Sequence, residues 1–252
     1  MPYAKLEDVN LYYEDIGVGE PVIFLHASFS RGILSFSAQL TEFHNDYRCI
    51  LPDFRCHGRS KADNLEWNMP QIADDIVQLM DQLKIYQARM IGFSLGGVIA
   101  FYLAIKYPER VKSFISIGAA AQINEALLKK ADNLEPEALI REEKTKFIEL
   151  VKKNHIEAHD GNWKKFIENT IRNWRTYPDF TDEEFSGITV PCKLIIGQND
   201  ATVLESEIEK LRKLIKHIEV DVIEGCGHGP HYIFEKPVAV NHLMKAFLIH
   251  HE

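Results

Sequence analysis

The sequence predicts an α/β fold in which a doubly wound, mostly parallel sheet carries an inserted helical segment. Short apolar runs typical of buried strands alternate with runs of helical spacing along most of the chain. This alternation stops between residues 121 and 188, where only amphipathic helical patterns occur, two or three in number. We therefore expect a core domain formed by residues 1–120 and 189–252, and a helical cap formed by residues 121–188. A chain of 252 residues is long enough for this arrangement.

The core elements follow from local patterns. The predicted strands, in chain order, cover residues 3–7, 11–15, 22–25, 47–51, 88–91, 111–117, 192–197 and 218–223. The first two are expected to form a hairpin with residues 8–10 at the turn. A helix is expected behind Asn68 as N-cap, with apolar side chains at helical spacing up to Leu83. A second helix follows Gly97 and ends near Tyr107, because Pro108 disfavours a helical conformation in the residue before it.

A serine lies where the strand at residues 88–91 turns into the helix that follows Gly97. Ser94 is flanked by Gly92 and Gly96, at positions so close together in a sharp turn that side chains would collide. The turn exposes the hydroxyl group and directs the N–H of Leu95 toward an oxygen that gains negative charge during attack. Glycine-rich turns of this kind also bind phosphate, so the pattern alone leaves both uses open.

A serine hydroxyl group becomes a good nucleophile only with a histidine to accept its proton and a carboxylate to orient that histidine. Asp200 follows the strand at residues 192–197, and His228 follows the strand at residues 218–223 between two glycines. These two residues are the expected acid and base. Asp200 could instead cap a helix, with Glu125 orienting the base. The rival histidines are His26, His57 and His231.

An oxyanion hole needs a second N–H group from an earlier loop. The strand at residues 22–25 ends in His26-Ala27-Ser28-Phe29, so we expect the Ser28 N–H to act together with that of Leu95.

The chain resembles the α/β-hydrolase superfamily, in the esterase-like branch with a small helical cap. The resemblance rests on the elbow around Ser94, on His26-Ala27-Ser28, on Asp53-Phe54-Arg55-Cys56-His57-Gly58-Arg59-Ser60, and on Gly227-His228 followed by Glu235-Lys236-Pro237. Ala27 and Cys56 depart from the glycine usual at these positions, and the spacing between His228 and Glu235 is slightly long. The resemblance implies an α/β-hydrolase fold and the chain order Ser94, Asp200, His228 for a catalytic triad.

The helical cap is expected to cover the site and to shape an apolar substrate pocket. Its aromatic side chains and those of the loops below are the candidates. We expect Phe29, Phe93, Trp163 and Trp174 to line the pocket.

Composition excludes several other classes of protein. A net charge of −8 and the lack of a basic stripe argue against a nucleic-acid partner. The apolar runs are too short for a membrane span, and the N-terminus lacks the pattern of a signal peptide, so a cytoplasmic protein with no membrane partner is expected. Four cysteines without C-x-x-C spacing indicate free thiols. No cofactor and no metal are expected, because triad chemistry requires neither. His155 and His159 lie four residues apart, but a zincin motif needs a glutamate directly after the first histidine.

These features predict a serine hydrolase that cleaves a carboxylic ester, lactone or thioester of a small to medium, largely apolar acyl substrate. Two alternatives remain open at this stage. The same triad could move protons in a C–C hydrolase or lyase, or the chain could be a ligand receptor with a retained hydrolase pocket.

Overall fold

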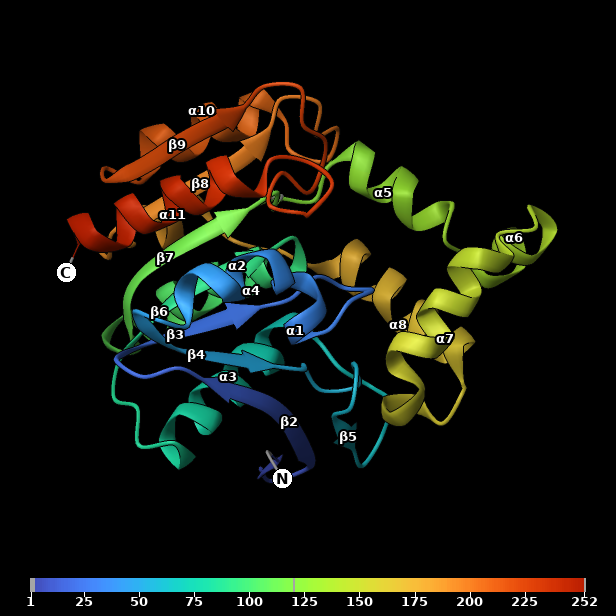
Figure 1. The fold of residues 1–252 in the computed structure, drawn as a ribbon. Helices are drawn as coiled ribbons and strands as arrows, with labels where there is room; N and C mark the ends of the chain where they lie inside the picture. The colour runs from blue at the N-terminus through green and yellow to red at the C-terminus, as the bar shows by residue number, and fades with distance from the viewer. Residues whose placement is uncertain (1–2, 120, 252) are drawn as a thin grey trace.

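The structure, a computed structural model, describes residues 3–119 and 121–251, in which a nine-stranded sheet carries helices on both faces (Figure 1). The strands are β1 (Tyr3–Lys5), β2 (Val9–Ile16), β3 (Glu20–Leu25), β4 (Tyr47–Pro52), β5 (Lys61–Ala62), β6 (Ala88–Phe93), β7 (Val111–Ile117), β8 (Cys192–Gly197) and β9 (Ile218–Ile223). Their order is β1-β2-β4-β3-β6-β7-β8-β9, with β5 paired to β2. Along this order, each neighbouring pair between β4 and β9 is parallel. Strand β2 pairs antiparallel with β1, β4 and β5. The predicted fold class is confirmed.

The helices complete the alternation. They are α1 (Gly32–Ser35), α2 (Ser37–Phe43), α3 (Met69–Gln82), α4 (Leu95–Lys106), the short 3-10 helix η1 (Pro108–Arg110), α5 (Glu125–Asp132), α6 (Pro136–Arg141), α7 (Thr145–His159), α8 (Trp163–Thr176), α9 (Asp182–Ser186), α10 (Glu205–Leu214) and α11 (Pro237–His250). The Asn68 side chain accepts a hydrogen bond from the Gln71 N–H, which confirms the predicted N-cap of α3.

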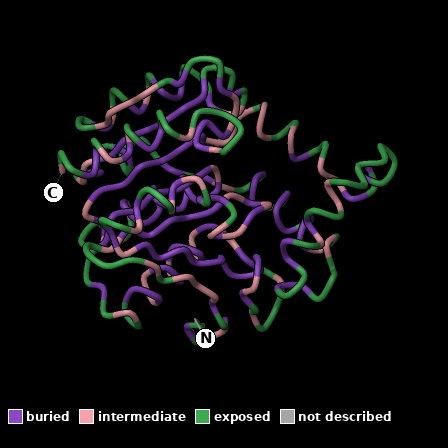
Figure 2. The backbone as a smooth tube through the Cα atoms, in the orientation of Figure 1, coloured by how far each residue is buried: buried purple, intermediate pink, exposed green. Residues whose placement is uncertain are grey.

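Both faces of the sheet are buried, which explains why its strands are continuous apolar runs. In β3, Ile23 and Leu25 pack on the face covered by α3 and α4, whereas Val22 and Phe24 pack on the face covered by α2 and α11. Successive side chains of a strand point to opposite faces, so each central strand contributes to two cores. Figure 2 shows these strands buried along their length. A sheet held from both sides is a rigid base for the loops at its carboxyl edge.

Two sequence predictions are corrected. The hairpin turn lies at residues 6–8 and not at residues 8–10, because Asn10 pairs with Lys5 within the ladder. The segment from residue 121 to residue 188 contains five helices, α5 to α9, and not two or three. The additional helices α6 and α9 span six and five residues, which is too short for a periodic apolar stripe. Residue 120, at the predicted domain boundary, lies outside the described residues.

The α5–α9 segment lies between β7 and β8 in the sequence. Helices α5 to α8 extend beyond the carboxyl ends of the parallel strands (Figure 1). None of the helices in the described ranges is long and apolar enough to cross a membrane. All four cysteines are buried free thiols, as predicted.

Candidate active site

Ser94 occupies a strained turn between β6 and α4. Its φ of 52° and ψ of −114° lie outside the usual regions for a residue with a side chain. The Ser94 N–H donates to the Ile117 carbonyl group on β7 at 2.8 Å, which ties the turn to the neighbouring strand. As residue N1 of α4, Leu95 has an N–H group without a partner inside the helix. The predicted strand–serine–helix elbow is therefore present.

The two flanking glycines are required by close backbone contacts. A Cβ atom at Gly92 would lie 2.1 Å from the Gly96 carbonyl oxygen. One at Gly96 would lie 1.9 Å from the Leu25 carbonyl oxygen on β3. Both contacts are with backbone atoms, which cannot rotate away as a flexible side chain could. The elbow thus packs against the sheet at a distance that only glycine permits.

We expect Gly96→Ala to lower the free energy of unfolding by about 3 kcal/mol or more, because β3 or α4 must shift to relieve the clash. Urea unfolding followed by circular dichroism measures this loss. Gly187→Ala is the matched control, since its added Cβ would come no closer than 3.4 Å to any neighbouring atom at a helical φ of −78°. Equal midpoints for the two variants would show that the elbow tolerates a side chain.

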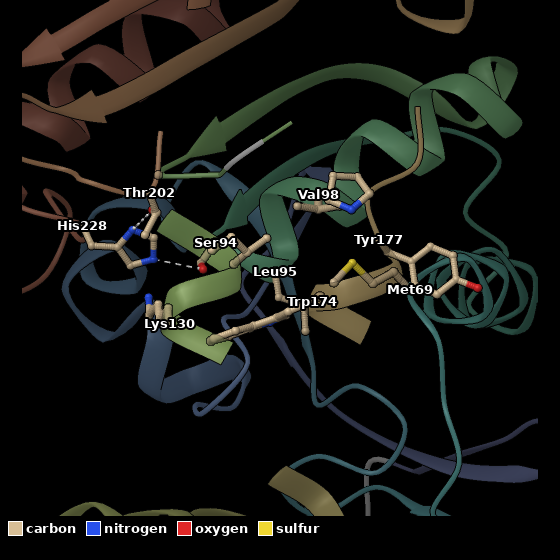
Figure 3. A pocket seen from close by; sticks show the side chains of 12 residues that line it. Met69, Ser94, Leu95, Val98, Lys130, Trp174, Tyr177, Thr202 and His228 are labelled. Carbon is tan, nitrogen blue, oxygen red and sulfur yellow. Dashed lines mark hydrogen bonds between the residues drawn. The ribbon is translucent and has the colours of Figure 1, made fainter. Parts of the chain in front are cut away.

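The structure brings Ser94, Asp200 and His228 together. His228 Nε2 lies 3.0 Å from Ser94 Oγ, and His228 Nδ1 lies 2.8 Å from Asp200 Oδ2. Each residue follows a parallel strand: β6, β8 and β9 end just before them. The Asp200 side chain is 1% exposed, whereas that of His228 is 32% exposed. The imidazole therefore joins a buried carboxylate to a hydroxyl group that faces a cavity. Figure 3 shows the contact between His228 and Ser94.

Thr202, which the sequence analysis did not identify, holds the carboxylate in place. Its Oγ1 donates to Asp200 Oδ1 at 2.6 Å and lies 3.1 Å from His228 Nδ1. Burial would raise the pKa of Asp200, but the hydrogen bonds from His228 and Thr202 outweigh it and lower that pKa below its usual value. Asp200 is thus kept as a carboxylate that can orient an imidazole ring and stabilise its protonated form.

The alternatives for acid and base occupy other places. Glu125 is an exposed residue in the first turn of α5, and the N-cap of α10 is Leu204 and not Asp200. The rival histidines are His26, His57 and His231. All three are buried, and each forms a hydrogen bond with a backbone group.

Two cavities meet at Ser94. The larger has a volume of about 520 Å³, within the range typical of ligand pockets, and the smaller has a volume of about 40 Å³. Four residues line both cavities: Ser94, Lys130, Trp174 and His228. A molecule bound at Ser94 can therefore extend in two directions, with a large group on one side and a small group on the other.

Three of the four predicted pocket residues line these cavities. Phe29, Phe93 and Trp174 border the larger one, and Trp174 also borders the smaller one. Trp163 borders neither and packs partly buried against the core. It lies at the first residue of α8, eleven residues before Trp174. At 1.5 Å per residue this is roughly 16 Å along the helix, too far to reach the same cavity.

Ser28 lies in the loop after β3, 3% exposed, and lines the larger cavity. Several other lining residues were not expected from the sequence. They are Leu34, Asn154 and Tyr232 in the larger cavity, Met69 and Val98 in the smaller one, and Lys130 in both.

Buried polar contacts attach α7 and α8 to the core. His155 Nδ1 accepts a hydrogen bond from the Gly58 N–H at 2.9 Å, and Asn154 Nδ2 donates to the Phe29 carbonyl group at 3.1 Å. Asn173 accepts from the Met69 N–H at 3.1 Å. These contacts fix α7, which lines the larger cavity, and α8, which lines both cavities through Trp174.

Comparison with known proteins agrees with this architecture. The alpha/beta hydrolase fold family matches residues 20–156. The chain is 27% identical to 3-oxoadipate enol-lactonase 2 of Acinetobacter baylyi, over 96% of this chain and 94% of that protein. It is 28% identical to a putative non-heme chloroperoxidase of Synechocystis, over 98% of this chain and all of that protein.

Solved structures show the same fold. A structure from a study of carboxylesterases of the ammonia-oxidizing thaumarchaeon Nitrososphaera gargenis superimposes with a TM-score of 0.84 at 20% identity, covering 99% of this chain and 98% of that one. The family match spans more than half of the sequence, and it includes the β3 loop and the Ser94 elbow. The chain belongs to the alpha/beta hydrolase fold family.

Proposed function

We propose that this protein is a serine hydrolase that cleaves carboxylic esters or lactones through an acyl-enzyme. One observation carries the proposal: Asp200, His228 and Ser94 are joined by hydrogen bonds of 2.8 and 3.0 Å, and the hydroxyl group faces two cavities. A serine hydroxyl group needs these two partners, a base and a carboxylate that orients the base, to attack an acyl carbon. The enol-lactonase relative, whose name denotes opening of a cyclic ester, supports the same class of reaction.

The reaction follows from the geometry. His228 Nε2 takes the Ser94 proton as Oγ attacks the acyl carbon, and it then gives that proton to the leaving alkoxide. Water next enters, His228 takes a proton from it, and the resulting hydroxide attacks the acyl-enzyme. Collapse of this second intermediate releases the carboxylic acid and returns the proton to Ser94. Asp200 holds the imidazole in the required tautomer throughout.

The oxyanion of each tetrahedral intermediate is assigned to the backbone N–H groups of Ser28 and Leu95. The N–H of Leu95 is at the N-terminus of α4, where the helix dipole favours negative charge. Ser28 comes from the loop after β3, the strand that pairs with β6 on the side opposite β7. The two donors thus come from neighbouring strands.

The two cavities suggest how a substrate is oriented. The 40 Å³ cavity admits a small group, whereas the 520 Å³ cavity admits a larger one of mostly apolar character. We assign the α5–α9 segment to the role of a cap, because Lys130, Asn154 and Trp174 reach the cavities from it. Substrate size is therefore limited by α5, α7 and α8 together with the core loops that line the same cavities.

Labelling with a fluorophosphonate tests the nucleophile directly. We expect the intact protein to gain the mass of one phosphonyl group and the Ser94 peptide to carry it, whereas Ser94→Ala protein stays unmodified. Rapid quenching with an activated ester should trap an acyl group on the same peptide. Modification elsewhere would contradict the assignment. Labelling of Ser94 without a trapped acyl group or ester turnover would favour proton-transfer chemistry or ligand binding.

A further inference from the structure

Lys130 is a cation in the wall of both cavities, and it has no ion-pair partner among the described residues. It lies in the last turn of α5 and lines each cavity together with Ser94 and His228 (Figure 3). No described carboxylate forms an ion pair with it, and its Nζ lies over the Trp174 ring, 5.4 Å from the ring centre. Its neighbour Lys129 has the same charge but is exposed on the outer side of the helix.

The position of Lys130 is costly for a cation that lacks a carboxylate partner. Burial lowers the pKa of its ammonium group, and the charge of Asp200 only partly opposes this effect. Lysine normally extends its charged end into water, and an unpaired cation beside apolar surface costs free energy. The cavity walls around it are mostly apolar, with Trp174 and Leu127 among the neighbours.

The charges of the rest of the molecule indicate what Lys130 can bind. The net charge of −8 repels anions at long range, so an anionic substrate requires a local positive charge in the site. Among the described residues that line these cavities, the other ionisable side chains are those of His228, Tyr177, Tyr232 and Glu235. Glu235 Oε2 accepts a hydrogen bond from the Gly227 N–H at 3.1 Å. Lys130 is therefore the cationic side chain of the described site that is able to form an ion pair with a carboxylate of a ligand.

We propose that Lys130 binds a carboxylate of the substrate, so that the preferred ester or lactone carries one negative charge in addition to its scissile bond. This inference rests on the proposed hydrolase function and names its substrate class. An ammonium group within the walls of both cavities can meet a carboxylate on either the acyl or the alcohol side of the scissile bond. The charge would fix which carbonyl group faces Ser94, because a correctly placed ion pair orients the whole substrate.

The test uses two pairs of esters that differ by one carboxylate. 4-Nitrophenyl hydrogen glutarate is compared with 4-nitrophenyl pentanoate for the acyl side, and 4-carboxyphenyl acetate with phenyl acetate for the alcohol side. For at least one pair, Lys130→Met should lower the ratio of kcat/KM values, anionic over neutral, by about 10–100-fold. Lys130→Arg should retain most of that ratio, and Lys129→Met should leave it unchanged.

A loss of activity on neutral and anionic esters alike, or unchanged ratios for both pairs, would overturn the role of Lys130. A binding measurement separates this from failure of the hydrolase proposal. Ser94→Ala protein, which cannot form an acyl-enzyme, is titrated with monomethyl glutarate and with methyl pentanoate by calorimetry. Tighter binding of the anion that is lost in Ser94→Ala/Lys130→Met supports the carboxylate site even if no ester is turned over. Equal binding of both compounds contradicts it.

Discussion

Replacing Ser94 with alanine is expected to lower kcat for an activated acyl ester by about 10⁶-fold, or ~8 kcal/mol of activation free energy. His228 Nε2 then lacks the hydroxyl group 3.0 Å away whose proton it would accept, and no acyl-enzyme forms. A residual rate of roughly 10³ over the uncatalysed reaction should remain, since the backbone N–H groups of the oxyanion hole are still present. Steady-state kinetics with a 4-nitrophenyl ester measures both values.

The fold should be unaffected by this substitution. Alanine at φ 52° has the same backbone strain as serine, and the Ser94 N–H still donates to the Ile117 carbonyl group. Ser186→Ala, which removes an exposed hydroxyl group from α9, is the control for the loss of a serine. If Ser94→Ala protein hydrolysed the ester as fast as the wild type, another group would be the nucleophile.

The relative placement of Ser94, Asp200 and His228 was predictable because topology determines it. In a parallel sheet the carboxyl ends of the strands share one edge, so residues far apart in the sequence converge when each follows a strand. The glycines of the elbow are a local sequence signal for the position of Ser94. They are required because the Leu25 and Gly96 carbonyl groups exclude any side chain there. The broad architecture followed from strand–helix alternation for similar reasons.

The cavity lining was harder to predict, because it depends on how helices with weak local signals pack. Trp163 and Trp174 lie on one face of α8 but at different positions along it. Trp174 therefore lines the cavities, whereas Trp163 packs against the core. Lys130 was missed, although Leu127 and the buried Ala131 place it on the inner face of α5. The helical spacing of Leu127, Lys130 and Ala131, counted from the N-cap Asn124, would have placed Lys130 on the inner face of α5 and Lys129 on the outer face.

Acidification from pH 7 to pH 5 is expected to lower the free energy of unfolding by about 5 kcal/mol or more, because buried histidines, among them His26, His57, His155 and His231, stay neutral in the folded protein. Burial lowers the pKa of His26, His57 and His231 to about 3 in each case. In the unfolded chain they titrate near pH 6.5, so stability is complete above this value and falls as the pH decreases from about 6.5 to about 3. At pH 5 each contributes a loss of roughly 2 kcal/mol.

Asp75 acts in the opposite direction. Burial raises its pKa to about 6, despite its ion pair with Arg55, so proton uptake by the folded protein offsets roughly 1 kcal/mol of this loss at pH 5. The net decrease is comparable to the whole stability of many domains, which is typically about 5–15 kcal/mol. Urea unfolding at pH 7, 6 and 5 in buffers of equal ionic strength measures it.

A single substitution assigns the effect to a histidine. His231 Nε2 contacts the Ser35 carbonyl group at 3.0 Å, and the amide of His231→Gln offers a donor that does not titrate. We expect this variant to lose stability less steeply between pH 6 and pH 5, by about 1.2 kcal/mol per pH unit, whatever its stability at pH 7. His242→Gln, at an exposed position on α11, should keep the wild-type slope. Parallel slopes for all three proteins would show that His231 already binds a proton in the folded state, which its burial beside Phe93 opposes.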